Sequence, residues 1–251
     1  MSKIVSIHSF RGGTGKSNTT ASLSALLAKQ GFRVGVIDTD IQSPGIHVLF
    51  GLDESDIKYS LNDYLWGKCE IQEAAHDVTG RLGADIKGQI YLIPSSIKAG
   101  EIVRVLREGY DVGLLNDGFR NLLHKLELDY LIVDTHPGLN EETLLSIAIS
   151  DALIIIMRPD QQDYQGTAVT VDVARKLDVP NLMLLINKMP QIFDFEDVRE
   201  RVKNTYNSTV AGILPHSDEM MALASSDIFV LRFPEHEITK ELEKVVALLV
   251  D

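Results

Sequence analysis

The feature that most constrains the fold of this chain is a glycine-rich turn between a strand-like run and a helix-like run. Residues 3–9 form a short strand-like run that contains Ile4, Val5 and Ile7. Residues 17–30 are rich in Ala and Leu, and Gly31 follows them as a helix-ending signal. The turn ends in Lys16 and Ser17. Glycines allow a tight turn in which successive N–H groups converge on phosphate oxygens, and the helix N-terminus adds a favourable dipole. This context predicts a phosphate-binding loop.

The rest of the chain continues the alternation of strands and helices. Short apolar runs predict strands at residues 3–9, 33–38, 89–94, 130–134, 152–157, 181–187 and 209–214. Helical patterns occupy residues 17–30, 161–177, 194–204 and 237–250. This alternation predicts an α/β fold with a single doubly wound, mostly parallel sheet and helices on both faces, spanning residues 1–251 as one domain. We expect the polar residues 52–88 to form helices and loops attached to this sheet.

The loop departs from the strict pattern G-x-x-x-x-G-K-[ST], because Phe10 occupies the first glycine position. Lys16 still supplies a positive charge for β- and γ-phosphates, and the Ser17 hydroxyl can ligate Mg²⁺. The alternative interpretation is a glycine-rich turn with no ligand. The position of the loop, its Gly-Lys-Ser ending and the acidic residues further along the chain favour phosphate binding.

Acidic residues end two of the predicted strands. Asp38 and Asp40 stand two positions apart, so their side chains point the same way on an extended segment. Asp134 ends the hydrophobic run at residues 130–134. At the carboxyl edge of a sheet, these carboxylates could hold Mg²⁺ through water or orient an attacking water. Helix capping and solvated loop acids are the alternative explanation.

Together these motifs resemble the ParA/MinD family of deviant Walker A P-loop ATPases, whose loop typically reads K-G-G-x-G-K-[ST]. The resemblance runs nearly end to end. It implies the P-loop NTPase fold, ATP/ADP and Mg²⁺ as cofactors, and a homodimer in the ATP state. Arg11 replaces the signature lysine, which in the family reaches the nucleotide of the partner subunit. Arginine keeps the charge but is bulkier and planar, and a solvated loop charge in a monomer is the alternative role.

The resemblance also implies roles for single residues. The sets are catalytic Asp40, Asp38, Lys16 and Arg11; metal-binding Ser17, Asp38 and Asp134; and nucleotide-binding Gly12, Gly13, Thr14, Gly15, Lys16, Ser17, Asn18, Asn187 and Pro215. The amide of Asn187 offers donors and an acceptor to an adenine edge. His136 replaces the first proline of the family's D-x-P-P-G, and we interpret it as a hydrogen-bonded loop residue rather than a phosphate or pH sensor. We interpret Arg158 as a surface charge rather than an assistant to Arg11.

Charge and cysteine content exclude several classes of protein. The 251 residues carry 24 Lys and Arg against 36 Asp and Glu, a formal net charge of −12. This balance argues against nucleic-acid binding over the whole surface. A local cluster such as Arg199, Arg201 and Lys203 leaves non-specific DNA binding open. The single Cys69 excludes an internal disulfide, and we interpret it as a buried thiol in a reducing compartment.

Nothing in the sequence predicts a membrane protein. No apolar run approaches the roughly 20 residues of a membrane span, and residues 1–7 are too short a run for a signal-peptide core. We therefore expect a cytoplasmic protein. Residues 237–250 have apolar positions at helical spacing, but residues 234–251 carry five acids and two bases. Anionic lipid favours basic helices, so we expect this face to pack in the core rather than on a membrane.

These observations predict a Mg²⁺-dependent ATPase that acts as an ATP-controlled dimerisation switch. The resemblance implies a role in spatial organisation, such as DNA partitioning or division-site or cargo positioning, with slow hydrolysis stimulated by an activating partner protein. One alternative, favoured by Arg11 and His136, is a nucleotide-binding regulatory or scaffold protein with little turnover. Another is a ligase or a reductase component on the same fold, although the sequence around Cys69 shows no iron–sulfur motif.

Overall fold

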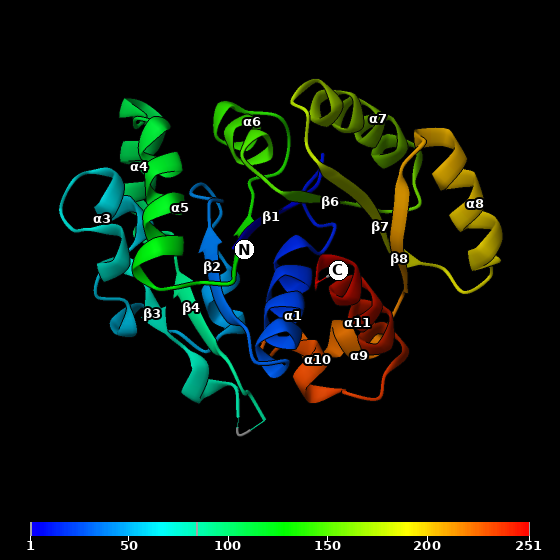
Figure 1. The fold of residues 1–251 in the computed structure, drawn as a ribbon, viewed down its shortest axis with the longest axis horizontal. Coiled ribbons are helices and arrows are strands. Elements are labelled where there is room, and N and C mark those ends of the chain that lie inside the picture. Colours follow the sequence, from blue (N-terminus) through cyan, green and yellow to red (C-terminus); the bar gives the residue numbers. More distant parts are fainter. Residues whose placement is uncertain (1, 84, 251) are drawn as a thin grey trace.

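A computed structural model describes residues 2–83 and 85–250. Residues 1, 84 and 251, which the expected domain range of 1–251 includes, lie outside the described residues. The strands are β1 (Lys3–His8), β2 (Arg33–Asp38), β3 (His76–Asp77), β4 (Gln89–Ile93), β5 (Tyr130–Asp134), β6 (Ala152–Met157), β7 (Asn181–Met189) and β8 (Thr209–Pro215). They form one sheet in the order β3-β4-β2-β5-β1-β6-β7-β8 (Figure 1).

The sheet is parallel except at one edge, where β3 pairs antiparallel with β4. The predicted mostly parallel sheet is confirmed, and each of the seven predicted strands is present. The expectation for residues 52–88 was wrong in one respect, because this segment also supplies the edge strand β3.

Helices connect the strands and cover both faces of the sheet. They are α1 (Lys16–Lys29), α2 (Ile46–Leu49), α3 (Leu61–Leu65), α4 (Ala99–Glu108), α5 (Gly113–Lys125), α6 (Glu141–Ala148), α7 (Gln161–Lys176), α8 (Phe195–Tyr206), α9 (Asp218–Leu223), α10 (Phe229–Arg232) and α11 (Glu237–Val250). Short 3₁₀ turns lie at η1 (Glu54–Asp56), η2 (Ile71–Ala74) and η3 (Thr79–Arg81). The predicted helices correspond to α1, α7, α8 and α11.

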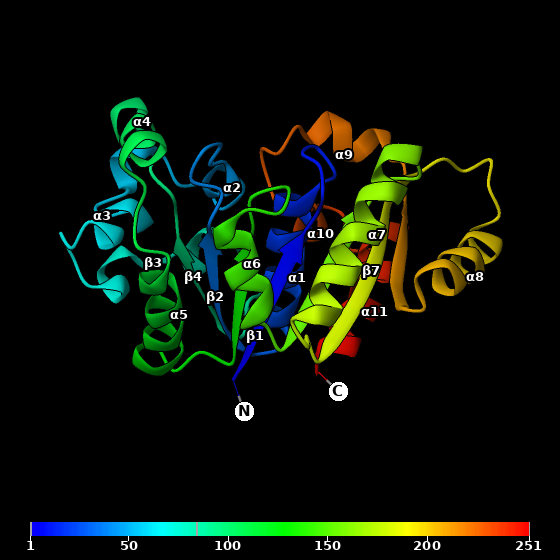
Figure 2. The ribbon, with the colours of Figure 1, turned by 90° about the horizontal axis from the view of Figure 1, so that it is seen from above.

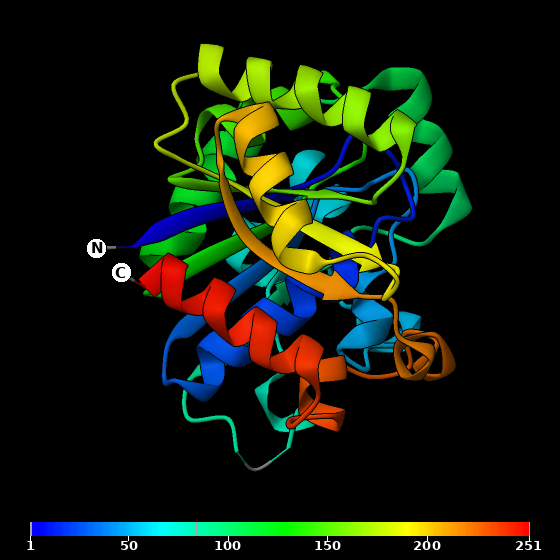
Figure 3. The ribbon, with the colours of Figure 1, turned by 90° about the vertical axis from the view of Figure 1, so that its right-hand side faces the viewer.

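Two layers of helices sandwich the sheet because successive strand residues point to opposite faces. Val5 and Ile7 of β1 belong to the core beneath α1, α10 and α11, whereas Ile4 belongs to the core beneath α3 and α5. Figure 2 shows α6 and α7 lying across the sheet, and Figure 3 shows α11 and α7 on opposite sides of it. The doubly wound arrangement is thereby confirmed.

The apolar face of α11 packs in the core, as the sequence predicted. Five of the six apolar residues at helical spacing are buried there: Ile238, Leu242, Val245, Val246 and Leu249. The prediction was wrong for the sixth, Leu248, which is 40% exposed. Lys3 Nζ donates to the carbonyl oxygen of Leu249 (2.6 Å), which ties the start of β1 to the end of α11. Across the described residues, no helix combines the length and apolarity needed to cross a bilayer.

The strand order brings the functional segments together at the carboxyl ends of the central strands. β1 lies between β5 and β6, and β2 lies on the other side of β5. In register, Ile7 and Asp38 both pair with Asp134. The ends of β1, β2 and β5 therefore lie side by side, and the glycine-rich loop follows β1 directly. Doubly wound folds bind their ligands beyond these carboxyl ends, at the point where the strand order reverses.

Candidate active site

The loop between β1 and α1 has the backbone that its glycines permit. Gly13 has φ of +75° and Gly15 has φ of +99°, in the left-handed region that side chains disfavour. Gly15 immediately precedes α1, and a Cβ atom there would overlap the side-chain amide of Asn187. Glycine is therefore required at Gly15 by both its conformation and its close neighbour.

Lys16 opens α1 and points its charge into an acidic environment. It is 7% exposed, and burial lowers the pKa of its ammonium group. The carboxylates of Asp134, Asp40 and Asp38 act in the opposite direction and favour the charged form. The structure thus brings together four predicted site residues that span nearly 120 positions of sequence. A charged Lys16 partly offsets three nearby acids.

Asp38 and Asp134 form a buried acidic pair on adjacent strands. They are 1% and 2% exposed. Burial, followed by the charge of Asp134, raises the pKa of Asp38 well above its usual range. Burial also raises the pKa of Asp134 to about 6, although a hydrogen bond from Ser17 and the charge of Lys16 oppose the rise. Thr20 Oγ1 donates to Asp134 Oδ1 (3.3 Å).

The donor set fits a divalent cation that is shared with a bound nucleotide. Two buried carboxylates beside the Ser17 hydroxyl carry negative charge that a cation would neutralise. Within residues 2–83 and 85–250, no group of three or more His, Cys, Asp or Glu is arranged to hold a metal. Mg²⁺ commonly uses one or two protein carboxylates and takes its other ligands from phosphates and water. Asp38 and Asp134 would supply these two carboxylates.

Asp38 also shapes the loop after β2. Its Oδ1 accepts from the backbone N–H of Asp40 (2.9 Å), and its Oδ2 accepts from that of Gly45 (3.3 Å). Ser95 Oγ donates to the carbonyl oxygen of Asp38 (2.7 Å). The side chain of Asp38 therefore fixes the position of Asp40.

His136 lies against Asp40. Its Nδ1 is 2.7 Å from Asp40 Oδ1, and the backbone N–H of Ser43 donates to the same oxygen (3.1 Å). The predicted hydrogen bond of His136 is present. The sequence did not predict its partner, which is 96 positions away.

Arg11 is engaged within its own chain. Its guanidinium lies 3.6 Å from Asp160 and 3.5 Å from Asp163, at the start of α7, with the side chain 40% exposed. Arg158 shares both acids, at 3.3 Å from Asp160 and 3.1 Å from Asp163. The interpretation of Arg158 as a plain surface charge is wrong, because its side chain is 26% exposed and holds the nearly buried Asp163. The two arginines therefore share one acidic cluster.

Asn187 joins the end of β7 to the glycine loop. Its Nδ2 donates to the carbonyl oxygen of Thr14 (2.8 Å), and its Oδ1 accepts from the N–H of Lys188 (2.8 Å). Lys188 Nζ donates to the carbonyl oxygen of Gly13 (2.8 Å). The sequence predicted no role for Lys188. Its backbone has a positive φ of 58°, which the sequence does not reveal.

A cavity of about 380 Å³ opens beside this contact. It brings together five of the predicted nucleotide-binding residues with further polar and thioether side chains. Its lining is Gly13, Gly15, Asn18, Asn187, Lys188, Pro215, His216, Ser217, Met220, Met221, Ala224 and Ser225. Its size and its position next to the loop fit the base and ribose of a nucleotide.

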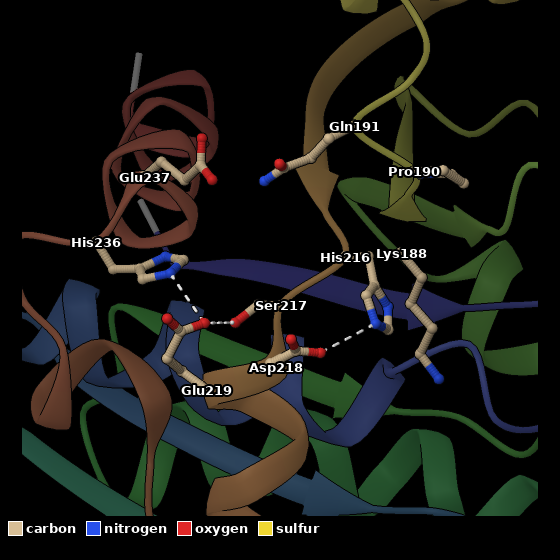
Figure 4. Close-up of a pocket in the computed structure, with 9 residues that line it drawn as sticks. All are labelled: Lys188, Pro190, Gln191, His216, Ser217, Asp218, Glu219, His236 and Glu237. Atoms are coloured by element: carbon tan, nitrogen blue, oxygen red, sulfur yellow. Dashed lines mark hydrogen bonds and ion pairs between the residues drawn. The ribbon is translucent and has the colours of Figure 1, made fainter.

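A second, more polar pocket of about 590 Å³ adjoins the first and shares Lys188, His216 and Ser217 with it (Figure 4). In Figure 4, His236 points toward Glu219, which accepts from Ser217 Oγ (2.8 Å). These side chains are already paired with one another. The pocket continues from the first cavity along the loop after β8.

Two sequence expectations outside the site are also modified. Arg199 is not a free surface cation, because it donates to the carbonyl oxygen of Val210 (2.9 Å) and to Glu241 (3.0 Å). Cys69 is half-buried rather than fully buried, and burial raises the pKa of its thiol to about 11.

Comparison with known proteins places the chain in a family. A family model described as an AAA domain matches residues 2–184. An uncharacterized ATP-binding protein of Methanocaldococcus jannaschii is 25% identical over 251 residues, covering 100% of this chain and 88% of that protein. A flagellum site-determining protein of Helicobacter pylori is 26% identical over 243 residues, covering 96% and 76%. An iron–sulfur cluster carrier protein of Pyrococcus furiosus is 28% identical over 192 residues, covering 73% and 60%.

Solved structures share the fold over nearly the whole chain. The cell division ATPase MinD of Pyrococcus furiosus superposes with a TM-score of 0.83 at 20% identity, covering 100% of this chain and 99% of that one. MinD of Pyrococcus horikoshii, complexed with Mg-ADP, gives 0.81 at 19% identity, covering 99% and 96%. A plasmid partition protein of Borrelia burgdorferi bound to AMPPNP gives 0.78 at 21% identity, covering 100% and 99%. By the matched family model the chain belongs to the family described as an AAA domain, and its fold is similar to that of the MinD and plasmid partition proteins.

Proposed function

We propose that this chain is a Mg²⁺-dependent ATPase that uses ATP to control its own dimerisation. The observation that carries the proposal is the meeting of Lys16, Asp38 and Asp134 beside the glycine loop, with Asp40 next to them. The similar MinD of Pyrococcus horikoshii is complexed with Mg-ADP, which supports the same ligands here.

The proposed reaction is the attack of water on the γ-phosphate of ATP. The water oxygen bonds to the γ-phosphorus while the bond from that phosphorus to the β–γ bridging oxygen breaks. ADP leaves with the electron pair. One proton of the water stays on the attacking oxygen and the other passes to a second oxygen of the released phosphate, which leaves as dihydrogen phosphate. The loop N–H groups and Lys16 hold the phosphates, while Asp40 orients the water. Mg²⁺, when bound at Ser17, Asp38 and Asp134, would neutralise phosphate charge.

The hydrogen bonds of Asn187 support adenine as the base. Its amide has two N–H donors and two acceptor lone pairs, of which Thr14 and Lys188 each use one. One donor and one lone pair remain, which match N7 and N6 of adenine. Guanine presents two acceptors at the corresponding edge and fits this remainder less well. Pro215 lines the same cavity and supplies an apolar surface for the ring.

We infer that the output is spatial organisation, in which a partner protein stimulates hydrolysis by the ATP-bound homodimer. The relatives include a flagellum site-determining protein and a plasmid partition protein, which supports this class of role. Non-specific DNA remains a candidate cargo surface. On α8 it would depend on Arg201 and Lys203, since Arg199 is paired with Glu241.

Gel filtration and phosphate release with ATP and Mg²⁺ test the proposal. The wild type is expected to form a transient dimer and to release phosphate. Lys16→Ala removes phosphate binding and is expected to stay monomeric, whereas Asp40→Ala is expected to accumulate as an ATP-bound dimer. Lys125→Ala, at an exposed position at the end of α5, is the matched control and should behave as wild type. The absence of a nucleotide-dependent dimer in Asp40→Ala would count heavily against the switch.

A second candidate is a nucleotide-binding regulatory or scaffold protein with little turnover. It is favoured by the pairing of Arg11 with Asp160 and Asp163 of its own chain, which holds the residue that replaces the signature lysine. ATP binding without phosphate release, even with the partner added, would support it. If an Arg11→Lys variant hydrolyses ATP faster than the wild type, the replacement of the signature lysine is the cause of the low turnover.

A further inference from the structure

The side chain of His136 contacts a residue of the proposed mechanism but has no part in that mechanism so far. Its Nδ1 lies 2.7 Å from Asp40 Oδ1, and the two side chains are 22% and 17% exposed. The family pattern that the chain resembles has proline here, which has no side-chain donor. The contact therefore depends on the histidine that replaces this proline.

The backbone that carries His136 is held on both sides. Thr143 Oγ1, in α6, donates to the carbonyl oxygen of His136 (3.3 Å). Thr135, which is fully buried, donates its hydroxyl proton to the carbonyl oxygen of Ile7 (3.0 Å). A hydroxyl has one proton, so His8 Nδ1, which lies 2.8 Å from Thr135 Oγ1, must be the donor in the contact between these two side chains. The segment is thereby fixed to β1 and α6, and the imidazole of His136 starts from a defined position.

The two oxygens of the Asp40 carboxylate have different surroundings. Oδ1 accepts from His136 and from the N–H of Ser43 (3.1 Å). In the part of the chain that the structure describes, no hydrogen bond to Oδ2 is formed. The N–H of Asp40 is itself held by Asp38 Oδ1 (2.9 Å). The carboxylate is clamped through one oxygen, and the other is available to a water molecule.

We propose that His136 is a positioning residue for Asp40, whose carboxylate it holds through Oδ1 so that Oδ2 is presented to the attacking water. This inference rests on the ATPase function proposed above. A group whose orientation is fixed before the reaction loses less freedom in the transition state, which lowers the barrier. His136 acts only through Asp40, so its effect belongs in kcat and not in nucleotide affinity.

The test compares His136→Ala and His136→Asn with the wild type and with His124→Ala, a control at an exposed position on α5. Asparagine keeps a side-chain N–H donor close to where the imidazole places Nδ1. Steady-state phosphate release gives kcat, and the fluorescence of a labelled ATP analogue gives Kd with Mg²⁺ present. Thermal melting confirms that each variant is folded, and the asparagine variant preserves the test if the alanine variant does not fold.

The expected result for His136→Ala is a kcat lowered about tenfold or more, with Kd changed by less than about twofold. His136→Asn should recover most of the loss, and His124→Ala should match the wild type. A kcat of His136→Ala within about twofold of wild type, or above it, would overturn the inference while leaving the ATPase function standing. An asparagine variant as slow as the alanine variant, or a Kd that rises as much as kcat falls, would also overturn it. A wild type that binds ATP without hydrolysing it would instead refute the ATPase function, and the inference with it.

Discussion

Gly166 of α7 packs directly against Phe10, the residue before Arg11 in the glycine loop. A Cβ atom at Gly166 would overlap the ring of Phe10 and lie 2.8 Å from its Cβ. Phe10 is 37% exposed, so its ring has one open side toward which it can move. Gly166→Ala therefore tests how firmly α7 holds the loop in place.

Two opposing effects determine the change in the free energy of unfolding. Alanine in a helix interior is more favourable than glycine by about 1 kcal/mol. Overlap with a packed ring costs about 1–3 kcal/mol. The net expectation for Gly166→Ala is a loss of about 0–2 kcal/mol, which is the difference of these two terms. In a Phe10→Ala background the overlap with the ring is absent and only the contact with Cβ at 2.8 Å remains, so the same change should cost less than in the wild type or stabilise the protein by up to about 1 kcal/mol.

Urea unfolding followed by circular dichroism, on the wild type, both single variants and the double variant, measures this as a double-mutant cycle. The expected coupling energy between Gly166 and Phe10 is about 1–3 kcal/mol. Effects that add to within about 0.5 kcal/mol would refute the reasoning, because they would mean that the ring moves aside freely. Phosphate release by the same four proteins shows whether a displaced Phe10 also disturbs Arg11.

Two further predictions concern residues away from the site. Arg199→Ala should lower the free energy of unfolding by about 1–3 kcal/mol, because it removes the side-chain donor to the carbonyl oxygen of Val210 and one of the donors to Glu241. Arg201→Ala, at an exposed position of the same helix, should change it by less than about 0.5 kcal/mol, and equal effects in urea unfolding would contradict this. Burial raises the pKa of Cys69 to about 11, so at pH 8 its thiolate fraction is about one in a thousand and its reaction with a disulfide reagent should be at least about tenfold slower than that of free cysteine. The rate should rise with pH up to about 11, and unfolding in urea should abolish the difference; a fast reaction of the folded protein at pH 8 would contradict the burial.

The parts of the fold that the sequence predicts are those with a strong local pattern. β5 and β6 are continuous apolar runs, and their bounds were predicted without error. β3 has two residues and no pattern of its own, because it exists only through its pairing with β4. α5 was not predicted, since it contains Gly113, Gly118 and other poor helix formers. Its burial of Phe119 and its neighbours in the core outweighs that propensity.

The site residues also divide into those with a local sequence pattern and those without one. Lys16, Asp38 and Asp134 could be predicted because each stands at the end of a recognisable strand or loop. The contact of His136 with Asp40 could not, because it depends on β2 and β5 lying side by side. The pairing of Arg11 with Asp163 likewise depends on where α7 begins. Such contacts join segments that share no local signal.

The acids buried with Lys16 have a consequence for the evolution and engineering of the chain. Asp38 and Asp134 are placed where burial opposes their charge, and they repel each other. A sequence selected only for a stable fold would replace them, so their presence marks a local conflict between folding and another requirement. A ligand that resolves the conflict binds the folded chain alone and adds its binding energy to stability. The melting temperature of the protein therefore rises with the fraction of molecules that have ligand bound, and it can be used to measure that fraction.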